Sequence, residues 1–213
     1  MSKRIYLVLA LMWVLILSTL IVSAFPPKLS GVHKTSSDVQ WFSDGSVVRG
    51  GRSTLVRQDN SISMHLNTFG LEPYTAVTIW WVIFNSPENC SHPEGPYRCG
   101  PGDLELFGGD ESVESSVLYA AGHVIGNRGM GGFGATLKKD DSVETLFGPG
   151  LTNPHGADVH LVVRSHGPII QGMTKEMIST FGGGCNNEDI PPCHGEPGPN
   201  MCKDLQFSVH ESL

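Results

Sequence analysis

Alternation of apolar and polar residues, the pattern of a half-buried β-strand, recurs along the chain. In SISMHLNT at 61–68, every second residue from Ile62 to Leu66 is apolar and the residues between them are polar. YTAVTIWWVIF at 74–84 is instead apolar on both faces, which predicts a central strand covered on both sides. The same reasoning predicts strands at 46–48, 53–58, 116–126, 130–139, 157–165 and 204–210.

Turn-forming residues separate these strands at intervals of about ten residues, as in all-β sandwiches and barrels. Only residues 171–180 fit a short helix, and the sequence has no long amphipathic helix and no repeat of fixed period. We therefore expect an all-β fold: an antiparallel, Greek-key-like β-sandwich of about seven or eight strands. Its long loops are expected to be stapled by disulfides.

The first residues have the pattern of a secretory signal peptide. Lys3 and Arg4 precede an apolar run over 5–22, and Ala24 ends the small residues that a signal peptidase reads. We expect cleavage after Ala24 and a secreted, periplasmic or extracellular protein. The apolar run is also long enough to span a bilayer, so an uncleaved membrane anchor stays open as the alternative.

The remaining chain is expected to form one domain. The polar, Pro-containing residues 25–43 indicate an extended N-terminal segment, and residues 44–213 are expected to be a single β-sandwich domain. A domain of this length can bury a core without metals or disulfides being obligatory.

The charge balance limits the partners. The formal net charge is −7, and losing the two basic residues of a signal peptide over 1–24 makes it −9. Nucleic-acid binding needs a basic surface that displaces counterions from phosphates, so a nucleic-acid partner is excluded. An anionic membrane surface is excluded on the same ground, leaving an unknown protein or a small ligand as the expected partner.

All five cysteines follow the apolar run, which favours disulfides in a secreted chain. Cys90 and Cys99 bracket a short loop that one bridge would staple. The last three lie in CNNEDIPPCHGEPGPNMC, where we favour a bridge between Cys185 and Cys202 because it closes the base of the loop. Cys193 is then left unpaired or takes an alternative partner, including a second molecule in a homo-oligomer.

Histidines on predicted strands are the candidate metal ligands. Copper and zinc take imidazole ligands that neighbouring strands can bring to one point, which makes His160, His65, His123 and His166 the candidates. In DVHLVVRSHGP at 158–168, His160 and His166 share one face but would be roughly 20 Å apart along a straight strand. Close-spaced HxH, HExxH and CxxC pairs are absent, so exposed or hydrogen-bonded strand histidines are the competing interpretation.

The sequence gives weaker indications for a calcium site, for covalent haem and for catalysis. Asp103, Asp110 and Glu111 offer oxygen ligands suited to Ca²⁺. Cys193 and His194 match the end of the haem-attachment motif CxxCH, but Ile190 replaces the first cysteine, which argues against covalent haem. No GxSxG nucleophile motif and no phosphate-binding glycine loop before a helix is found, so no catalytic residues are predicted.

Two stretches carry a resemblance to a known family. GLEPYTAVTIWWVIFN at 70–85 and GLTNPHGADVHLVVRSHGP at 150–168 together resemble the chordin-type (CHRD) secreted β-sandwich domains, and the layout is similar to the copper/zinc superoxide dismutase sandwich. Where chordin-type domains have HxH, this chain has Asp158-Val159-His160. The strand that corresponds to the dismutase HxH reads WWVIF, so the dismutase ligands are not carried over. The HLVVRSHGP and STFGGGC stretches are also similar to uncharacterised secreted bacterial proteins.

The sequence thus supports three hypotheses about function. The first is a secreted, non-enzymatic β-sandwich that acts as a binding or structural module. The second is a copper- or zinc-binding metalloprotein that uses the strand histidines. The third is a subunit of an extracellular assembly, in which the N-terminal arm over 25–43 adds a strand to a neighbouring subunit.

Overall fold

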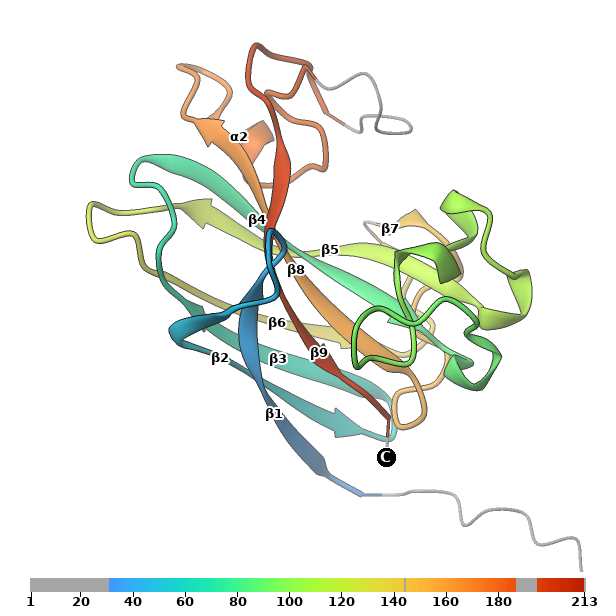
Figure 1. Ribbon diagram of the computed structural model, residues 1–213. Helices are drawn as coiled ribbons and strands as arrows, with labels where there is room; N and C mark the ends of the chain where they lie inside the picture. Colours follow the sequence, from blue (N-terminus) through green and yellow to red (C-terminus); the bar gives the residue numbers. More distant parts are fainter. Residues whose placement is uncertain (1–30, 144, 187–194, 213) are drawn as a thin grey trace, which may run out of the picture.

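The computed structural model describes residues 31–143, 145–186 and 195–212. Within them, nine strands form one antiparallel sheet with the order β6-β3-β2-β1-β9-β8-β4-β5-β7 (Figure 1). The strands are β1 (His33–Trp41), β2 (Val47–Gln58), β3 (Ser61–Thr68), β4 (Thr75–Phe84), β5 (Ser115–Val124), β6 (Gly131–Lys138), β7 (Thr145–Phe147), β8 (Asp158–Pro168) and β9 (Lys203–His210). The helical pieces are η1 (Pro87–Asn89), η2 (Pro101–Asp103), η3 (Glu105–Phe107), η4 (Glu111–Val113) and α2 (Thr174–Met177).

The all-β, antiparallel prediction is confirmed, and three local predictions are corrected. The runs at 46–48 and 53–58 are one strand, β2, which continues through an irregularity at Gly50, where φ is +79° and the register with β1 shifts. The helix expected over 171–180 is limited to the four residues of α2. The short strand β7 was not predicted; it pairs with β5 at the end of the sheet.

Residues 33–41 are part of the sheet, which corrects the prediction of an extended segment over 25–43 that precedes the domain. They form β1, which pairs with β2 and, through Gln40 and Trp41, with β9. Val39 of β1 is fully buried in the main core. The expected arm at 25–30 and the expected signal peptide at 1–24 lie outside the described residues.

The sheet curls so that its two halves face each other across the main core (Figure 1). The chain passes between the halves three times, from β3 to β4, from β5 to β6 and from β6 to β7, and β6 contacts β5. Leu55, Ile62 and Leu66 from one half meet Trp81 and Leu161 from the other, and all five are buried. Burial of these apolar side chains is the main force that holds the halves together.

A second apolar cluster covers the opposite face of β4 and β8. Trp80 and Phe84 of β4 point away from the main core and pack against Cys99, Leu104 and Val113. The last three belong to the β4–β5 loop, residues 85–114, drawn in green in Figure 1. Strand β4 is therefore covered on both sides, as its continuous apolar pattern predicted.

The β4–β5 loop is fixed by its own polar contacts. Cys90 and Cys99 form a disulfide, and the buried carboxylate of Asp103 accepts hydrogen bonds from the backbone N–H groups of Ser91 and His92, at 2.7 and 2.9 Å, and of Gly100. Burial alone would raise the pKa of Asp103, but these backbone hydrogen bonds outweigh it and lower the pKa. The loop is thereby held as an ordered cover over the sheet.

The loop is also fastened to the end of β8. Arg98 donates two hydrogen bonds, at 3.1 and 2.7 Å, to the two carboxylate oxygens of Asp158, which is fully buried. This contact joins a loop residue to the first residue of β8. A bidentate arginine–carboxylate pair fixes both distance and orientation, so the loop has a defined position over β8.

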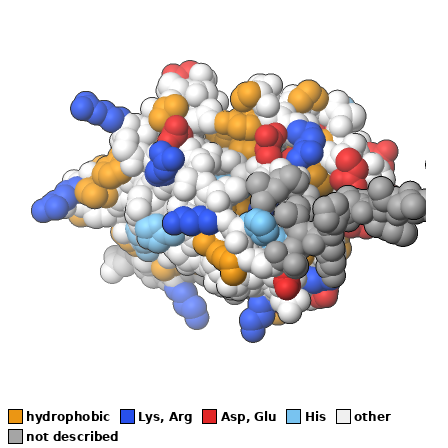
Figure 2. Space-filling view, turned by 90° about the horizontal axis from the view of Figure 1, so that it is seen from below, with side chains coloured by type: hydrophobic (Ala, Val, Ile, Leu, Met, Phe, Trp, Pro, Cys, Tyr) orange, Lys and Arg blue, Asp and Glu red, His pale blue; other side chains and the backbone are white. Residues whose placement is uncertain are grey.

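Among the described residues, no helix has the length and apolar character needed to cross a membrane. On the face at the lower end of Figure 1, basic and acidic side chains are interspersed with histidines (Figure 2).

Candidate functional site

His160 lies on the outer face of β8, beneath the β4–β5 loop. Its ring packs edge-on against Phe84 at a centroid distance of 5.1 Å and against Tyr97 at 6.3 Å. Only 9% of the residue is exposed. The ring atom Nε2 is buried and has no hydrogen-bond partner among the described residues. Since buried polar atoms nearly always have partners, this exception needs an explanation.

Burial also sets the protonation state of His160. Removal of the ring from water disfavours the imidazolium form and lowers the pKa to about 4, although the nearby carboxylate of Asp158 opposes the shift. The imidazole is therefore neutral at physiological pH. A neutral imidazole has one nitrogen that donates and one that accepts a hydrogen bond.

The imidazole of His160 lines a cavity of roughly 230 Å³ between the outer face of the sheet and the loop. Its walls are mainly aromatic and aliphatic side chains: Trp41 at the end of β1 and Phe42 after it, Trp80, Val82 and Phe84 of β4, Tyr97, Leu104, Leu106 and Phe107 of the loop, Val117 of β5, Leu146 and Phe147 of β7, Val162 of β8, Phe181, and Phe207 of β9. Such an apolar enclosure with few polar groups is typical of small-molecule sites.

Two aromatic side chains mark where the cavity opens to solvent. Phe42 and Phe107 line it and are nevertheless 42% and 62% exposed. Phe42 packs against Phe207 at a centroid distance of 4.7 Å, so the opening lies beside β9. Exposed aromatic residues at the mouth of an apolar cavity give a ligand its first contact surface.

The charged residues that line the cavity, Glu94 and Asp204, are both acidic. Asp204 is ion-paired with Arg164 at 2.9 Å. The guanidinium of Arg164 also donates to the carbonyl of Phe181 and lies 4.1 Å above its ring. Arg164 does not itself line the cavity; it lies behind two residues that do, Asp204 and Phe181.

The four histidines predicted as metal ligands lie in four different parts of the structure. His65 is exposed on β3 beside Asn67, and His123 on β5 stacks on Phe133 at 4.5 Å, where burial lowers its pKa. His160 is in the cavity, and His166 is at the far end of β8. In the described part of the chain, no group of three possible ligand atoms includes His65, His123 or His160. The structure does not bring the four together.

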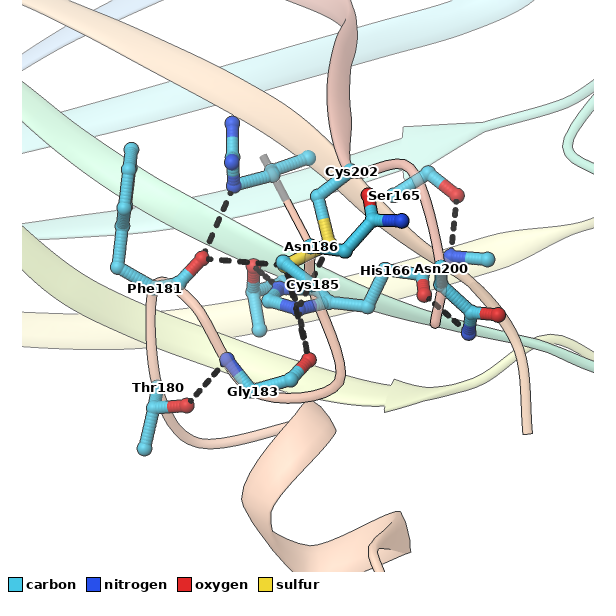
Figure 3. The surroundings of a disulfide bond; sticks show 12 residues. Ser165, His166, Thr180, Phe181, Gly183, Cys185, Asn186, Asn200 and Cys202 are labelled. Atoms are coloured by element: carbon cyan, nitrogen blue, oxygen red, sulfur yellow. Dashed lines mark hydrogen bonds between the residues drawn. A yellow bond between two sulfur atoms is a disulfide. The ribbon is translucent and has the colours of Figure 1, made fainter. Parts of the chain in front are cut away.

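His166 is a buried residue of β8. Its Nδ1 donates to the carbonyl of Gly183 at 2.9 Å, so its Nε2 accepts from the hydroxyl of Thr78, also at 2.9 Å (Figure 3). Burial, aided by Arg164, lowers its pKa to about 4 against the opposing hydrogen bond to Gly183. Both ring nitrogens are satisfied, which makes His166 a structural residue.

Both predicted disulfides are confirmed, Cys90–Cys99 and Cys185–Cys202. Cys185 and Cys202 lie beside the ring of His166 (Figure 3). Their sulfurs, with His166, make up one of two possible metal groups in the described chain, and Cys90, Cys99 and Asp103 make up the other. In both, the sulfurs are bonded to each other and offer no thiolate. Cys193 and His194 lie outside the described residues.

The residues predicted for Ca²⁺ act in loop structure instead. Asp103 is occupied by the three backbone N–H groups described above, and the Asp110 carboxylate accepts from the backbone N–H of Ser112 at 2.8 Å at the start of η4. Glu111 is exposed. These carboxylates do not converge in the described chain.

Comparison with family models, with curated proteins and with solved structures found no match to this chain. The likeness to chordin-type domains therefore stays a prediction from the sequence. The two disulfides indicate an oxidising compartment. What the protein does has to be argued from the geometry of the site.

Sequence reasoning found His160 but not the cavity around it. The walls come from β4, β8, β9 and the β4–β5 loop, which are brought together only by the curl of the sheet and by the loop's fastening to Asp158. A usable signal was present: Val162 lies on the same strand face as His160 and Arg164, and a lone aliphatic residue between polar ones indicates a covered surface.

Proposed function

We propose that the protein binds a small apolar molecule in the cavity between β4, β8 and the β4–β5 loop, and that it does so as a secreted, non-enzymatic binding module. The carrying observation is an aromatic-lined cavity that contains one buried polar ring with an unpaired nitrogen. Because the cavity opens to solvent at Phe42 and Phe107, its aromatic walls leave apolar surface in contact with water, which a bound ligand would cover.

The cavity is large enough for a ligand of defined size. An engineered apolar cavity of about 150 Å³ holds benzene. The cavity described here, at roughly 230 Å³, therefore suits a molecule of about two fused rings. In the cavity wall, Phe181 packs edge-on against Trp80, and His160 packs edge-on against Phe84. Walls made of such rings favour a flat aromatic ligand over a branched aliphatic one.

Naphthalene is a suitable probe, since it is uncharged, flat and of this size. We expect saturating naphthalene to raise the melting temperature of the purified protein, because a ligand that binds only the folded state stabilises it. The variant Val82→Trp should abolish this shift, since Val82 lines the cavity and is paired with His160 across the strands.

The matched control is Val143→Trp, which adds the same side chain at a position that is 73% exposed and does not line the cavity. It should keep the naphthalene shift. No shift in the wild-type protein, or an equal shift in Val82→Trp, would overturn the proposal.

A further inference from the structure

We infer that the cavity selects uncharged aromatic molecules that carry one hydroxyl or N–H group, and that it rejects carboxylates of the same size. This inference rests on the proposed function, whose site it describes further. It follows from the imidazole of His160 and from the charges around the cavity.

The imidazole of His160 supplies the reason for a polar group on the ligand. It lines the cavity, and its buried Nε2 has no partner. Two further polar rings of the cavity wall have hydrogen-bond partners: the hydroxyl of Tyr97 accepts from the side-chain amide of Gln40, and the indole N–H of Trp80 donates to the hydroxyl of Thr78. A ligand hydroxyl can either donate to or accept from a neutral imidazole, so it satisfies His160 in either tautomer.

The lining charges supply the reason for rejecting carboxylates. Glu94 and Asp204 are acidic, the second being paired with Arg164, and no Lys or Arg of the described residues lines the cavity. Arg164 pairs through Nη1 with Asp204 and donates through Nε to the Phe181 carbonyl, and its side chain does not line the cavity. The imidazole of His160 is kept neutral by burial and adds no positive charge. A carboxylate entering this site would lose its hydration without gaining an ion pair, which is strongly unfavourable.

The test is calorimetric titration of the full chain with naphthalene, 2-naphthol and 2-naphthoate, which share one ring system. We expect 2-naphthol to bind about tenfold more tightly than naphthalene, the effect of one net hydrogen bond. We expect 2-naphthoate to bind at least about tenfold more weakly than 2-naphthol because its charge is not compensated.

Two variants assign these differences to residues. In His160→Phe, 2-naphthol and naphthalene should bind within about twofold of each other, since the hydrogen bond is lost and the ring shape is kept. In Glu94→Gln, 2-naphthoate affinity should rise about twofold while 2-naphthol affinity stays unchanged, as expected for removal of one partly screened charge.

The outcomes separate the two proposals. If naphthalene binds in a manner sensitive to Val82→Trp but 2-naphthoate binds as tightly as 2-naphthol, the selectivity inference is overturned and the proposed function stands. A preference for 2-naphthol that persists in His160→Phe also overturns the inference. If none of the three compounds binds the wild-type protein, the proposed function itself fails. Glu94→Gln provides the charge test even if His160→Phe does not fold.

Discussion

Three buried histidines of the sheet differ in one decisive respect. His166 has both ring nitrogens bonded, and so does His210, whose Nδ1 and Nε2 lie 2.8 Å from the hydroxyls of Thr35 and Ser53 respectively. The ring of His160 lines the cavity, and its Nε2 has no hydrogen-bond partner among the described residues. Five other side chains of the described residues also have a buried polar atom without a partner, but among these six only His160 lines the cavity, which supports a ligand as its partner.

This difference predicts opposite effects of the same substitution at two positions. His160→Phe should raise the free energy of unfolding of the ligand-free protein by about 1 kcal/mol, because it removes an unsatisfied buried group. His166→Phe should lower it by about 2 kcal/mol, because Thr78 and the Gly183 carbonyl lose their partner. Urea unfolding measures both, and an equal loss of stability in the two variants would show that His160 is structural.

Single residues also show what the sequence could and could not reveal about the site. His160 was recognised as a strand histidine from its position in DVHLVVRSHGP, because alternation is a local property. Tyr97 and Phe207 were not connected with it, since they are 63 residues before and 47 residues after it in the chain. Contacts over such separations depend on sheet order and loop conformation, which periodicity does not contain.

At the scale of elements, the β4–β5 loop is the part that turns a sheet face into a cavity. Tyr97 lies within the short segment closed by the Cys90–Cys99 disulfide and contacts both His160 and Phe207. Asp103 binds the backbone of this segment, and Arg98, which lies in the segment, pairs with Asp158 of β8. The position of one cavity wall therefore depends on the disulfide.

The double variant Cys90→Ser/Cys99→Ser tests this dependence. Opening a loop of this length should lower the free energy of unfolding by about 2–3 kcal/mol. It should also weaken 2-naphthol binding about tenfold, because the wall that bears Tyr97 is no longer fixed before binding. Calorimetric titration well below the melting temperature, with near-UV circular dichroism as the control for folding, separates the two effects. Unchanged affinity in a folded variant would contradict this role of the loop.

Strand β1 shows why one element was missed. HKTSSDVQW has only one aliphatic residue, Val39, so its pattern resembles a polar lead-in. The strand is nevertheless enclosed, because Thr35 pairs with the buried His210 and the backbone pairs with β2 and β9. In β1, polar side-chain contacts and backbone pairing hold the strand in the sheet. The apolar alternation on which strand prediction depends is therefore missing. The longer, apolar strands β3, β4, β8 and β9 were predicted within a few residues.

At the scale of the whole molecule, one sheet provides two buried surfaces. The inner face closes on the main core, and the outer face of β4 and β8 carries the cavity. The all-β class and both disulfides followed from the sequence, because turn spacing and cysteine positions are local. The curl and the strand order did not, since they depend on which distant strands pair.

The buried histidines also predict how global stability responds to pH. Burial lowers the pKa values of His160, His166 and His210 from 6.5 to about 4 in the folded protein. Between these values the unfolded chain binds more protons, so stability should be full above pH 6.5 and should fall as the pH decreases towards 4. In His160→Phe the slope in this window should be smaller by about one proton. Thermal unfolding across this range measures the slope, and an unchanged slope in the variant would contradict the assignment.

The central claim, that a neutral ligand pairs with His160 in the outer cavity, can be observed at the imidazole itself. The measurement is the ¹⁵N spectrum of the full chain with ¹⁵N-labelled histidine during titration with 2-naphthol, with His160→Phe assigning the signal among nine histidines. We predict a saturable shift of the His160 ring nitrogens, while those of His166 and His210 stay in place. Saturation without a shift at His160, or shifts confined to exposed histidines such as His65, would contradict the account.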